Sequence, residues 1–265
     1  MENKILLTLL ILTFLIGGVI GFYYPKNTER NITENVQQII NNNPSVSVTT
    51  ISETNKPFTI NAQYPQFTLV DQSFNAKIAD LINNKIKEFK NNSTENLKAV
   101  NETATAENPA PDWEFYFKSD WAPAQINKNY ISFVINIYSF SGGAHGNSEV
   151  YTFNYDLASK KEISFNDFIG NSEDNLNKIS QLAVEDLVNQ RGNYGETNTV
   201  EVKKELEEGG ASPNINNFST FTFDNQILTI YYQKYQVGPG VLDILKTVFN
   251  KSILDQSSVK SAYFK

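Results

Sequence analysis

Residues 58–89 of the chain read FTINAQYPQFTLVDQSFNAKIADLINNKIKEF, and the spacing of the apolar positions changes within this stretch. Apolar and polar side chains alternate over residues 58–64, which predicts a strand that ends at Pro65. From Phe74 to Phe89 the apolar residues recur at helical spacing and share one face of a predicted helix. Such a face has to be buried, so we expect the helix to pack on neighbouring strands.

The remaining chain carries more strand patterns and one more helical pattern. The strand-like segments are residues 113–117, 131–137, 151–155 and 227–235. Residues 174–190 have helical spacing, and the polar residues 91–111 predict an exposed excursion. Strands and helices mix without regular strand–helix–strand alternation, which favours the α+β class.

The N-terminal segment predicts attachment to a membrane. Residues 5–24 contain no charged side chain, and a helix of that length rises about 30 Å, the thickness of a hydrocarbon core. We therefore predict a transmembrane signal anchor at residues 5–24, a cytoplasmic N-terminus at residues 1–4 and a polar linker at residues 25–55. The protein is then expected in the cell membrane, single-pass with an extracytoplasmic C-terminal domain. The alternative is a cleaved signal peptide, which predicts a secreted protein.

Composition excludes several classes of site. The net charge is -7 and no cluster of Lys and Arg is present, so we expect no nucleic-acid partner. The chain has no Cys and one His, which excludes disulfides, thiolate zinc sites and cysteine nucleophiles. We accordingly predict no metal site and no cofactor.

Three motifs carry a resemblance to a known family. Tyr64-Pro65-Gln66 precedes the first helix, residues 138–145 read YSFSGGAH, and residues 232–240 read YQKYQVGPG. With these motifs the chain resembles the extracytoplasmic domain of unknown function shared by RsiV-type anti-sigma factors and PdaC-type peptidoglycan deacetylases.

The resemblance implies both an architecture and a role. It implies two small subdomains behind an N-terminal membrane-spanning helix, PdaC-like at residues 56–140 and RsiV-like at residues 141–265, each mixing antiparallel strands with one main helix. It also implies a binding or sensing module of the cell envelope, with lysozyme or peptidoglycan fragments as possible ligands. A single His cannot supply the multi-His metal site of the family's separate catalytic domain, so we expect this chain not to be an enzyme.

The motif loops supply the candidate ligand-binding residues. They are Ser141, Gly142, Gly143, His145, Tyr235 and Pro239. His145 either holds its glycine-rich loop in place or acts as a general base beside Ser141, and the second reading gives a cell-wall hydrolase as the alternative function. Tyr235 either contributes to an aromatic recognition surface or belongs to the core.

An acidic run comprises Glu205, Glu207 and Glu208. We expect it to be a solvated face, and the alternative is that it steers a basic partner such as lysozyme toward the chain.

Overall fold

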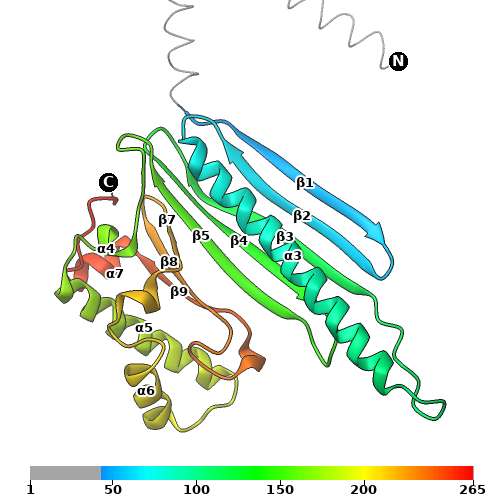
Figure 1. Cartoon of the computed structure of the whole chain (residues 1–265). Helices are drawn as coiled ribbons and strands as arrows, with labels where there is room; N and C mark the ends of the chain where they lie inside the picture. Colours follow the sequence, from blue (N-terminus) through cyan, green and yellow to red (C-terminus); the bar gives the residue numbers. More distant parts are fainter. Residues whose placement is uncertain (1–42, 265) are drawn as a thin grey trace, which may run out of the picture. The chain divides into compact units, whose positions relative to one another are not determined.

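The computed structural model describes residues 43–264 and confirms the α+β class (Figure 1). A first sheet has six strands in the order β1-β2-β3-β4-β5-β6. The strands are β1 (Val46–Asn55), β2 (Phe58–Phe67), β3 (Phe115–Ile126), β4 (Tyr130–Phe140), β5 (Asn147–Asp156) and β6 (Lys161–Glu162). β2 and β3 are parallel neighbours, whereas the other neighbouring pairs are antiparallel.

Helix α3 (Gln72–Thr103) lies along one face of this sheet and connects β2 to β3 (Figure 1). Its buried apolar residues Phe74, Ile78, Ile82 and Phe89 belong to the predicted apolar face. The ring of Phe74 lies 4.6 Å from that of Tyr155 on β5, measured between centroids. Burying each large apolar side chain contributes about 1.5–3 kcal/mol, so this face joins the helix firmly to the sheet.

The structure corrects two local predictions about the first helix and strand. The sequence predicts an exposed excursion at residues 91–111, but α3 continues to Thr103. Residues 91–103 contain no Gly or Pro that would end a helix. Pro65 lies within β2 instead of ending it. β3 pairs with β2 only as far as Ala62, so the missing N–H of Pro65 costs no hydrogen bond to β3.

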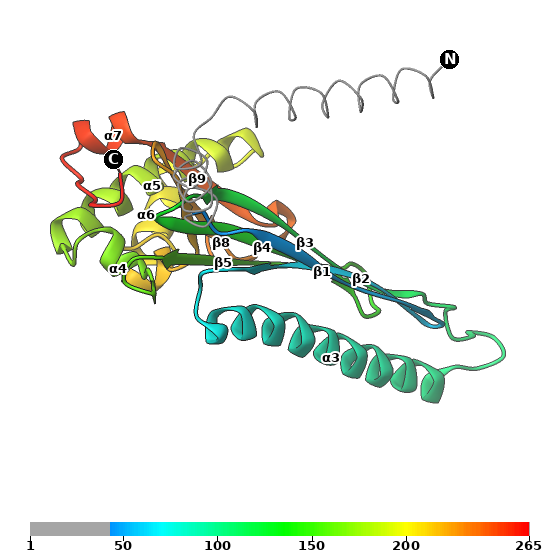
Figure 2. The same ribbon diagram turned by 90° about the horizontal axis from the view of Figure 1, so that it is seen from above.

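A second sheet, antiparallel in the order β7-β8-β9, forms the other part of the described chain. Its strands are β7 (Phe221–Phe223), β8 (Ile227–Tyr232) and β9 (Leu245–Asn250). The accompanying helices are α4 (Phe165–Phe168), α5 (Glu173–Asn193), α6 (Thr199–Glu208), η1 (Ile215–Phe218), η2 (Gly240–Leu242) and α7 (Lys251–Gln256). Both views show α4 to α7 gathered around this sheet and away from α3 (Figures 1 and 2).

The second sheet docks on the face of the first sheet that points away from α3, which we call the outer face. Ser132 and Asn154 are buried there, and the Ser132 hydroxyl donates to Asn154 Oδ1 over 2.7 Å. Asn154 Nδ2 donates to the Phe221 carbonyl oxygen over 2.8 Å, and the Phe223 N–H donates to Ser132 Oγ over 3.0 Å. These bonds fix β7 across β4 and β5 and leave the opposite end of the outer face uncovered by the second sheet.

Several predicted boundaries change. The predicted linker at residues 25–55 overlaps β1, whose Val, Thr and Ser residues favour a strand once β2 pairs with it. The first sheet is not purely antiparallel, because β2 and β3 run parallel. The second part carries both α5 and α6 instead of one main helix. β5 and β6 follow residue 140 but complete the first sheet.

The predicted transmembrane anchor at residues 5–24 and the cytoplasmic residues 1–4 lie outside the described residues. Within residues 43–264, no helix combines the length and the apolar character that crossing a bilayer requires.

Candidate functional site

The predicted site residues Ser141, Gly142, Gly143 and His145 lie in the loop between β4 and β5. Gly142 has φ +102° and Gly143 has φ +97°, a region that side chains other than glycine rarely adopt. Gly142 also packs so closely that an added Cβ would lie 2.9 Å from the indole ring of Trp113. The Ser141 carbonyl oxygen accepts from Asn96 Nδ2 on α3 over 2.8 Å. The glycines therefore shape the loop, and α3 holds it.

His145 is exposed, and its Nδ1 lies 2.9 Å from the carbonyl oxygen of Gly146. In the described part of the chain, no hydrogen bond joins His145 to Ser141. The structure thus places both residues in one loop without pairing them as a nucleophile and its base.

The backbone of this loop supports an exposed aromatic side chain. A Cβ added to Gly146 would lie 2.2 Å from the Tyr138 hydroxyl oxygen, so only glycine lets the loop approach that ring. Tyr138 stacks on Tyr116 of β3 with centroids 5.6 Å apart, and Tyr116 stacks on Phe140 at 5.5 Å. We call Tyr116, Tyr138 and Phe140 the aromatic shelf. It lies at the uncovered end of the outer face.

Two hydroxyls and partial burial set the electrostatics of the shelf. The adjacent Tyr116 hydroxyl, followed by burial, raises the pKa of Tyr138 above its ordinary value. Tyr138 therefore keeps its proton at neutral pH and can both donate and accept a hydrogen bond. Tyr116 is 42% exposed and Tyr138 is 37% exposed, so both side chains are partly accessible.

A cavity of about 240 Å³ adjoins the shelf, and we call it the shelf cavity. Its lining residues are Lys118, Asp120, Asn136, Ile137, Tyr138, Ser148, Glu149, Asp243 and Ile244. Lys118 Nζ lies 3.1 Å from Asp120 Oδ2, and Asn136 Nδ2 donates to Asp120 Oδ1 over 3.0 Å. The cavity thus combines an aromatic wall with amide, hydroxyl and carboxylate groups.

Asp243 closes the shelf cavity from the loop between β8 and β9. The hydroxyl of Ser148 on β5 donates to Asp243 Oδ2 over 3.1 Å. This bond joins the first sheet to the β8–β9 loop of the second sheet. Asp243 has φ +55° and ψ −136°, a backbone conformation that costs a residue other than glycine about 1–3 kcal/mol. Sequence patterns did not single out Asp243, because neither its backbone angles nor its contact with β5 leaves a periodic signal.

Tyr235 and Pro239 lie in the same β8–β9 loop but do not line the shelf cavity. Tyr235 is 66% exposed at φ +70°, so it is not a core residue. A Cβ added to Gly240 would lie 2.2 Å from the Tyr235 ring, and Pro239 directly precedes η2. Both residues therefore shape the loop that carries Asp243.

A charged cluster lies on the α3 side of β5, and we call it the Lys85 cluster. Lys85 Nζ lies 2.6 Å from Glu149 Oε2 and 3.1 Å from Glu88 Oε2, and the Tyr151 hydroxyl donates to Glu149. Burial alone lowers the pKa of Lys85, but the hydrogen bonds to Glu149, Tyr151 and Glu88 raise it overall. Burial, reinforced by Glu149, raises the pKa of Tyr151 to about 12. The cluster neutralises Glu149 from the side opposite the shelf cavity.

The acidic run is the solvated face that the sequence predicts, because Glu205, Glu207 and Glu208 are all exposed. Glu207 and Glu208 make exposed pairs with Lys203 and Lys204 on α6. Glu205 Oε2, by contrast, lies 2.9 Å from Nη2 of Arg191, a buried side chain on α5. No sequence pattern indicated that Arg191 would turn inward.

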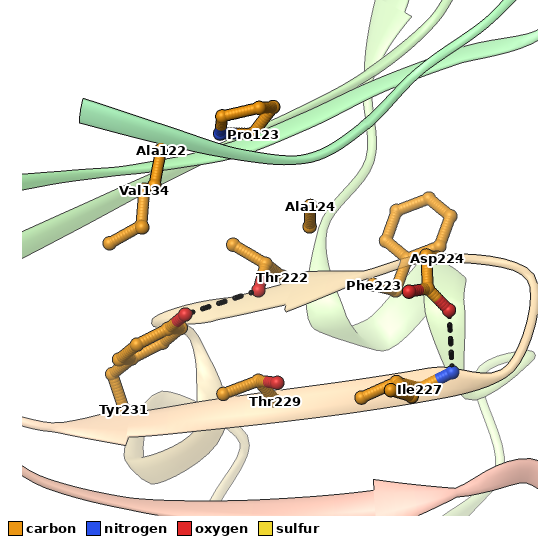
Figure 3. A pocket seen from close by; sticks show the side chains of 10 residues that line it. All are labelled: Ala122, Pro123, Ala124, Val134, Thr222, Phe223, Asp224, Ile227, Thr229 and Tyr231. Carbon is orange, nitrogen blue, oxygen red and sulfur yellow. Dashed lines mark hydrogen bonds between the residues drawn. The ribbon is translucent and has the colours of Figure 1, made fainter.

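Another cavity, of about 270 Å³, lies between the two sheets (Figure 3). Figure 3 shows Val134 on the first sheet pointing toward Thr222, Thr229 and Tyr231 on the second. Asp224 Oδ1 accepts from the Ile227 N–H over 2.7 Å and is thus used in the β7–β8 turn. Asp224 is the one charged residue in the lining of this cavity, whereas Lys118, Asp120, Glu149 and Asp243 line the shelf cavity, so we take the shelf cavity as the candidate ligand site.

Within residues 43–264, no three side chains of His, Cys, Asp or Glu gather closely enough to hold a metal ion.

Two family models match separate parts of the chain. Residues 51–148 match the model described as deacetylase PdaC, and residues 166–242 match a protein of unknown function, DUF3298. The first match contains the aromatic shelf, and the second contains most of the loop that leads to Asp243. The resemblance indicated by the motifs is thus confirmed.

A curated relative is the peptidoglycan-N-acetylmuramic acid deacetylase PdaC of Bacillus subtilis (strain 168). It is 23% identical over 245 residues, which cover 92% of this chain and 48% of the relative. The chain therefore spans about half the length of this relative. This comparison contradicts the expectation that the chain is not an enzyme, because the relative is a deacetylase.

Two solved structures of DUF3298 family proteins match most of the chain, each with a TM-score below 0.5. A DUF3298 family member from Bacteroides fragilis is 19% identical, with a TM-score of 0.49, and the match covers 80% of this chain and 92% of that one. A DUF3298 family protein from Pseudomonas aeruginosa PAO1 is 11% identical, with a TM-score of 0.43 and coverage of 80% and 91%.

Proposed function

We propose that the chain is a module of the cell envelope that binds the glycan strands of peptidoglycan, because parts of it match the PdaC and DUF3298 family models. The proposed binding site is the aromatic shelf together with the shelf cavity. The deacetylase activity of the curated relative supports a peptidoglycan ligand.

The exposed stack of Tyr116 and Tyr138 carries this proposal. A pyranose ring presents an apolar face of C–H groups and a rim of hydroxyl and amide groups. Flat aromatic rings match the apolar face, and the phenol hydroxyls match the rim. Asn136 and Ser148 place further donors and acceptors beside the rings. Ligand sites commonly combine apolar walls with a few polar groups in this way.

The decisive experiment measures binding of the full chain to purified peptidoglycan by co-sedimentation and to glycan oligomers by calorimetry. We expect the double variant Tyr116→Ala, Tyr138→Ala to lose at least about tenfold in affinity, the equivalent of about 1.4 kcal/mol. The matched control is Tyr194→Ala, because Tyr194 is 64% exposed and follows α5, away from the shelf. Unchanged affinity in a double variant that still folds would sink the proposal.

A lysozyme-type protein is a second candidate partner, favoured by the net charge of -7. Such an association between opposite charges weakens as salt screens it. Stacking of a neutral glycan on the shelf is much less sensitive to salt. Titrations with lysozyme and with glycan at two salt concentrations separate these partners.

Enzymatic function is tested on the same preparations. Release of acetate from peptidoglycan reports deacetylation, and loss of wall turbidity reports hydrolysis. The hydrolase alternative predicts that His145→Ala abolishes wall degradation while the protein remains folded. Glycan binding at the shelf predicts that His145→Ala leaves the affinity for glycan unchanged.

A further inference from the structure

The charges of the shelf cavity are unevenly compensated. Asp120 is paired with Lys118 and accepts a hydrogen bond from Asn136. Glu149 is neutralised from the other side of the sheet by Lys85, at 2.6 Å. Asp243 takes part in none of the ion pairs of residues 43–264. The cavity therefore keeps one carboxylate that forms no ion pair within residues 43–264.

The Asp243 carboxylate has spare capacity to accept hydrogen bonds. A carboxylate can accept about four, and Asp243 accepts one from the Ser148 hydroxyl over 3.1 Å. Asp243 and Tyr138 both line this cavity, and the backbone of Asp243 is the C-terminal cap of η2. A sugar that stacks on the shelf and enters the cavity would thus lie near this carboxylate.

We infer that the shelf cavity prefers glycans whose amino sugars carry a free, protonated amine over the same glycans in N-acetylated form, with Asp243 as the residue that selects the ammonium group. The inference rests on the proposed glycan site and specifies its ligand class. An acetamido group offers one neutral N–H donor, whereas an ammonium group offers three donors and a positive charge. Hydrogen bonds between charged partners are about twice as strong as neutral ones, so we expect roughly tenfold tighter binding of the amine form.

The test compares two probes of equal length, an N-acetylglucosamine hexamer and a glucosamine hexamer, titrated into the full chain at pH 6 by calorimetry. We expect the glucosamine hexamer to bind about tenfold more tightly. Asp243→Asn should remove this preference, so that the two hexamers bind with similar affinity. Asn tolerates a positive φ as Asp does, so the variant should keep the loop conformation.

The control variant is Asp255→Asn, which removes the same charge from α7, where Asp255 pairs with Lys251. It should keep the preference, which separates a local effect of Asp243 from general attraction to an acidic protein. At pH 9, where an amine of ordinary pKa near 8 is mostly neutral, the preference should largely disappear. Among the groups around the cavity, Tyr138 stays protonated at that pH because its pKa is raised.

Three results would overturn the inference: equal affinity for the two hexamers, tighter binding of the acetylated hexamer, or a preference that survives in Asp243→Asn. If neither hexamer binds, the glycan site itself is refuted. If both bind and the shelf variants lose both, but no preference is seen, the glycan site stands and only the selection by Asp243 fails.

Discussion

Arg191 joins three segments of the second part of the chain from a position that is only 3% exposed. Its Nε and Nη2 atoms donate to the two carboxylate oxygens of Glu196 over 2.9 and 2.6 Å, and Nη2 also contacts Glu205 on α6. Nη1 donates to the Val237 carbonyl oxygen over 3.2 Å. Hydrogen bonding to Glu196 outweighs burial and raises the pKa of Arg191 further above its ordinary value, so it stays charged.

Replacement of Arg191 by Ala should lower the free energy of unfolding by about 2–3 kcal/mol. The change removes a bidentate pair and leaves a buried carbonyl without its donor, although solvent reaches Glu196 and Glu205 and reduces the loss. Denaturant unfolding monitored by circular dichroism measures this value. Lys203→Ala, which breaks an exposed pair, should cost less than about 0.5 kcal/mol. Similar values for the two variants would contradict the structural role of Arg191.

Tyr151 and Lys85 predict a loss of stability at alkaline pH. The pKa of Tyr151 is raised from 10.0 to about 12, so the folded state keeps a proton that the unfolded state releases. The raised pKa of Lys85 acts in the same direction. Their stabilising effect is complete below about pH 10 and declines as the pH rises toward 12.

The measurement for this cluster is urea unfolding at pH 8 and at pH 11. We expect the free energy of unfolding to fall between these values, and to fall less in Tyr151→Phe, which has no phenol proton to lose. A variant with the same decline as the parent protein would show that other groups cause it.

The packing of β7 on β4 and β5 depends on polar groups instead of apolar side chains alone. Ser132 and Asn154 form hydrogen bonds with each other and with backbone groups of β7. In addition, the Phe221 N–H donates to Thr152 Oγ1 over 3.0 Å. This contact fixes where the second sheet stops. Since it covers only one end of the outer face, the aromatic shelf at the other end stays accessible.

Ser132→Ala should therefore destabilise the protein by about 1–3 kcal/mol, because the Phe223 N–H and Asn154 Oδ1 would each lose a buried partner. Ser47→Ala on the exposed edge strand β1 is the matched control and should change stability by less than about 0.5 kcal/mol. Thermal and denaturant unfolding of both variants provide the comparison. A neutral Ser132→Ala would mean that apolar packing alone holds β7.

Periodicity predicted the elements whose residues bury a regular face. The apolar face of α3 from Phe74 to Phe89 and the alternation around Phe133 and Phe153 are confirmed. Periodicity did not predict β1, because its Thr and Ser residues are typical of a polar linker and the strand forms by pairing with β2. It also missed the last turns of α3, where polar residues carry no apolar period and only Leu97 packs partly on the core.

The candidate site was predicted only in part, because it is assembled from segments that are distant along the chain. The glycines at 142 and 143 signalled the β4–β5 loop, and the residues around Pro239 signalled the β8–β9 loop. The sequence did not show that the β8–β9 loop meets strands of the first sheet at one cavity, since that depends on β7 docking and on the contact of Asp243 with Ser148. None of the predicted site residues lines this cavity, so their role in binding stays a prediction.

The two hydrophobic cores of the described chain should unfold together. β4 contributes Ile131 and Phe133 to the core under α3, while Tyr130, at the start of the same strand, belongs to the core of the second part. Differential scanning calorimetry should therefore show one transition whose calorimetric and van't Hoff enthalpies agree. Two resolved transitions would show that the second part unfolds independently.

The parallel pairing of β2 with β3 also sets an order of assembly on the ribosome. A nascent chain can form the β1–β2 hairpin as soon as Phe67 has emerged, but β2 receives its other neighbour only after α3 and Phe115 have been synthesised. The face toward α3 can then close, while Ser132 and Asn154 remain hydrated until β7 is made. A translation product truncated before Phe221 should thus bury the core under α3 and leave the side chains of the outer face, Ser132 and Asn154 among them, open to solvent.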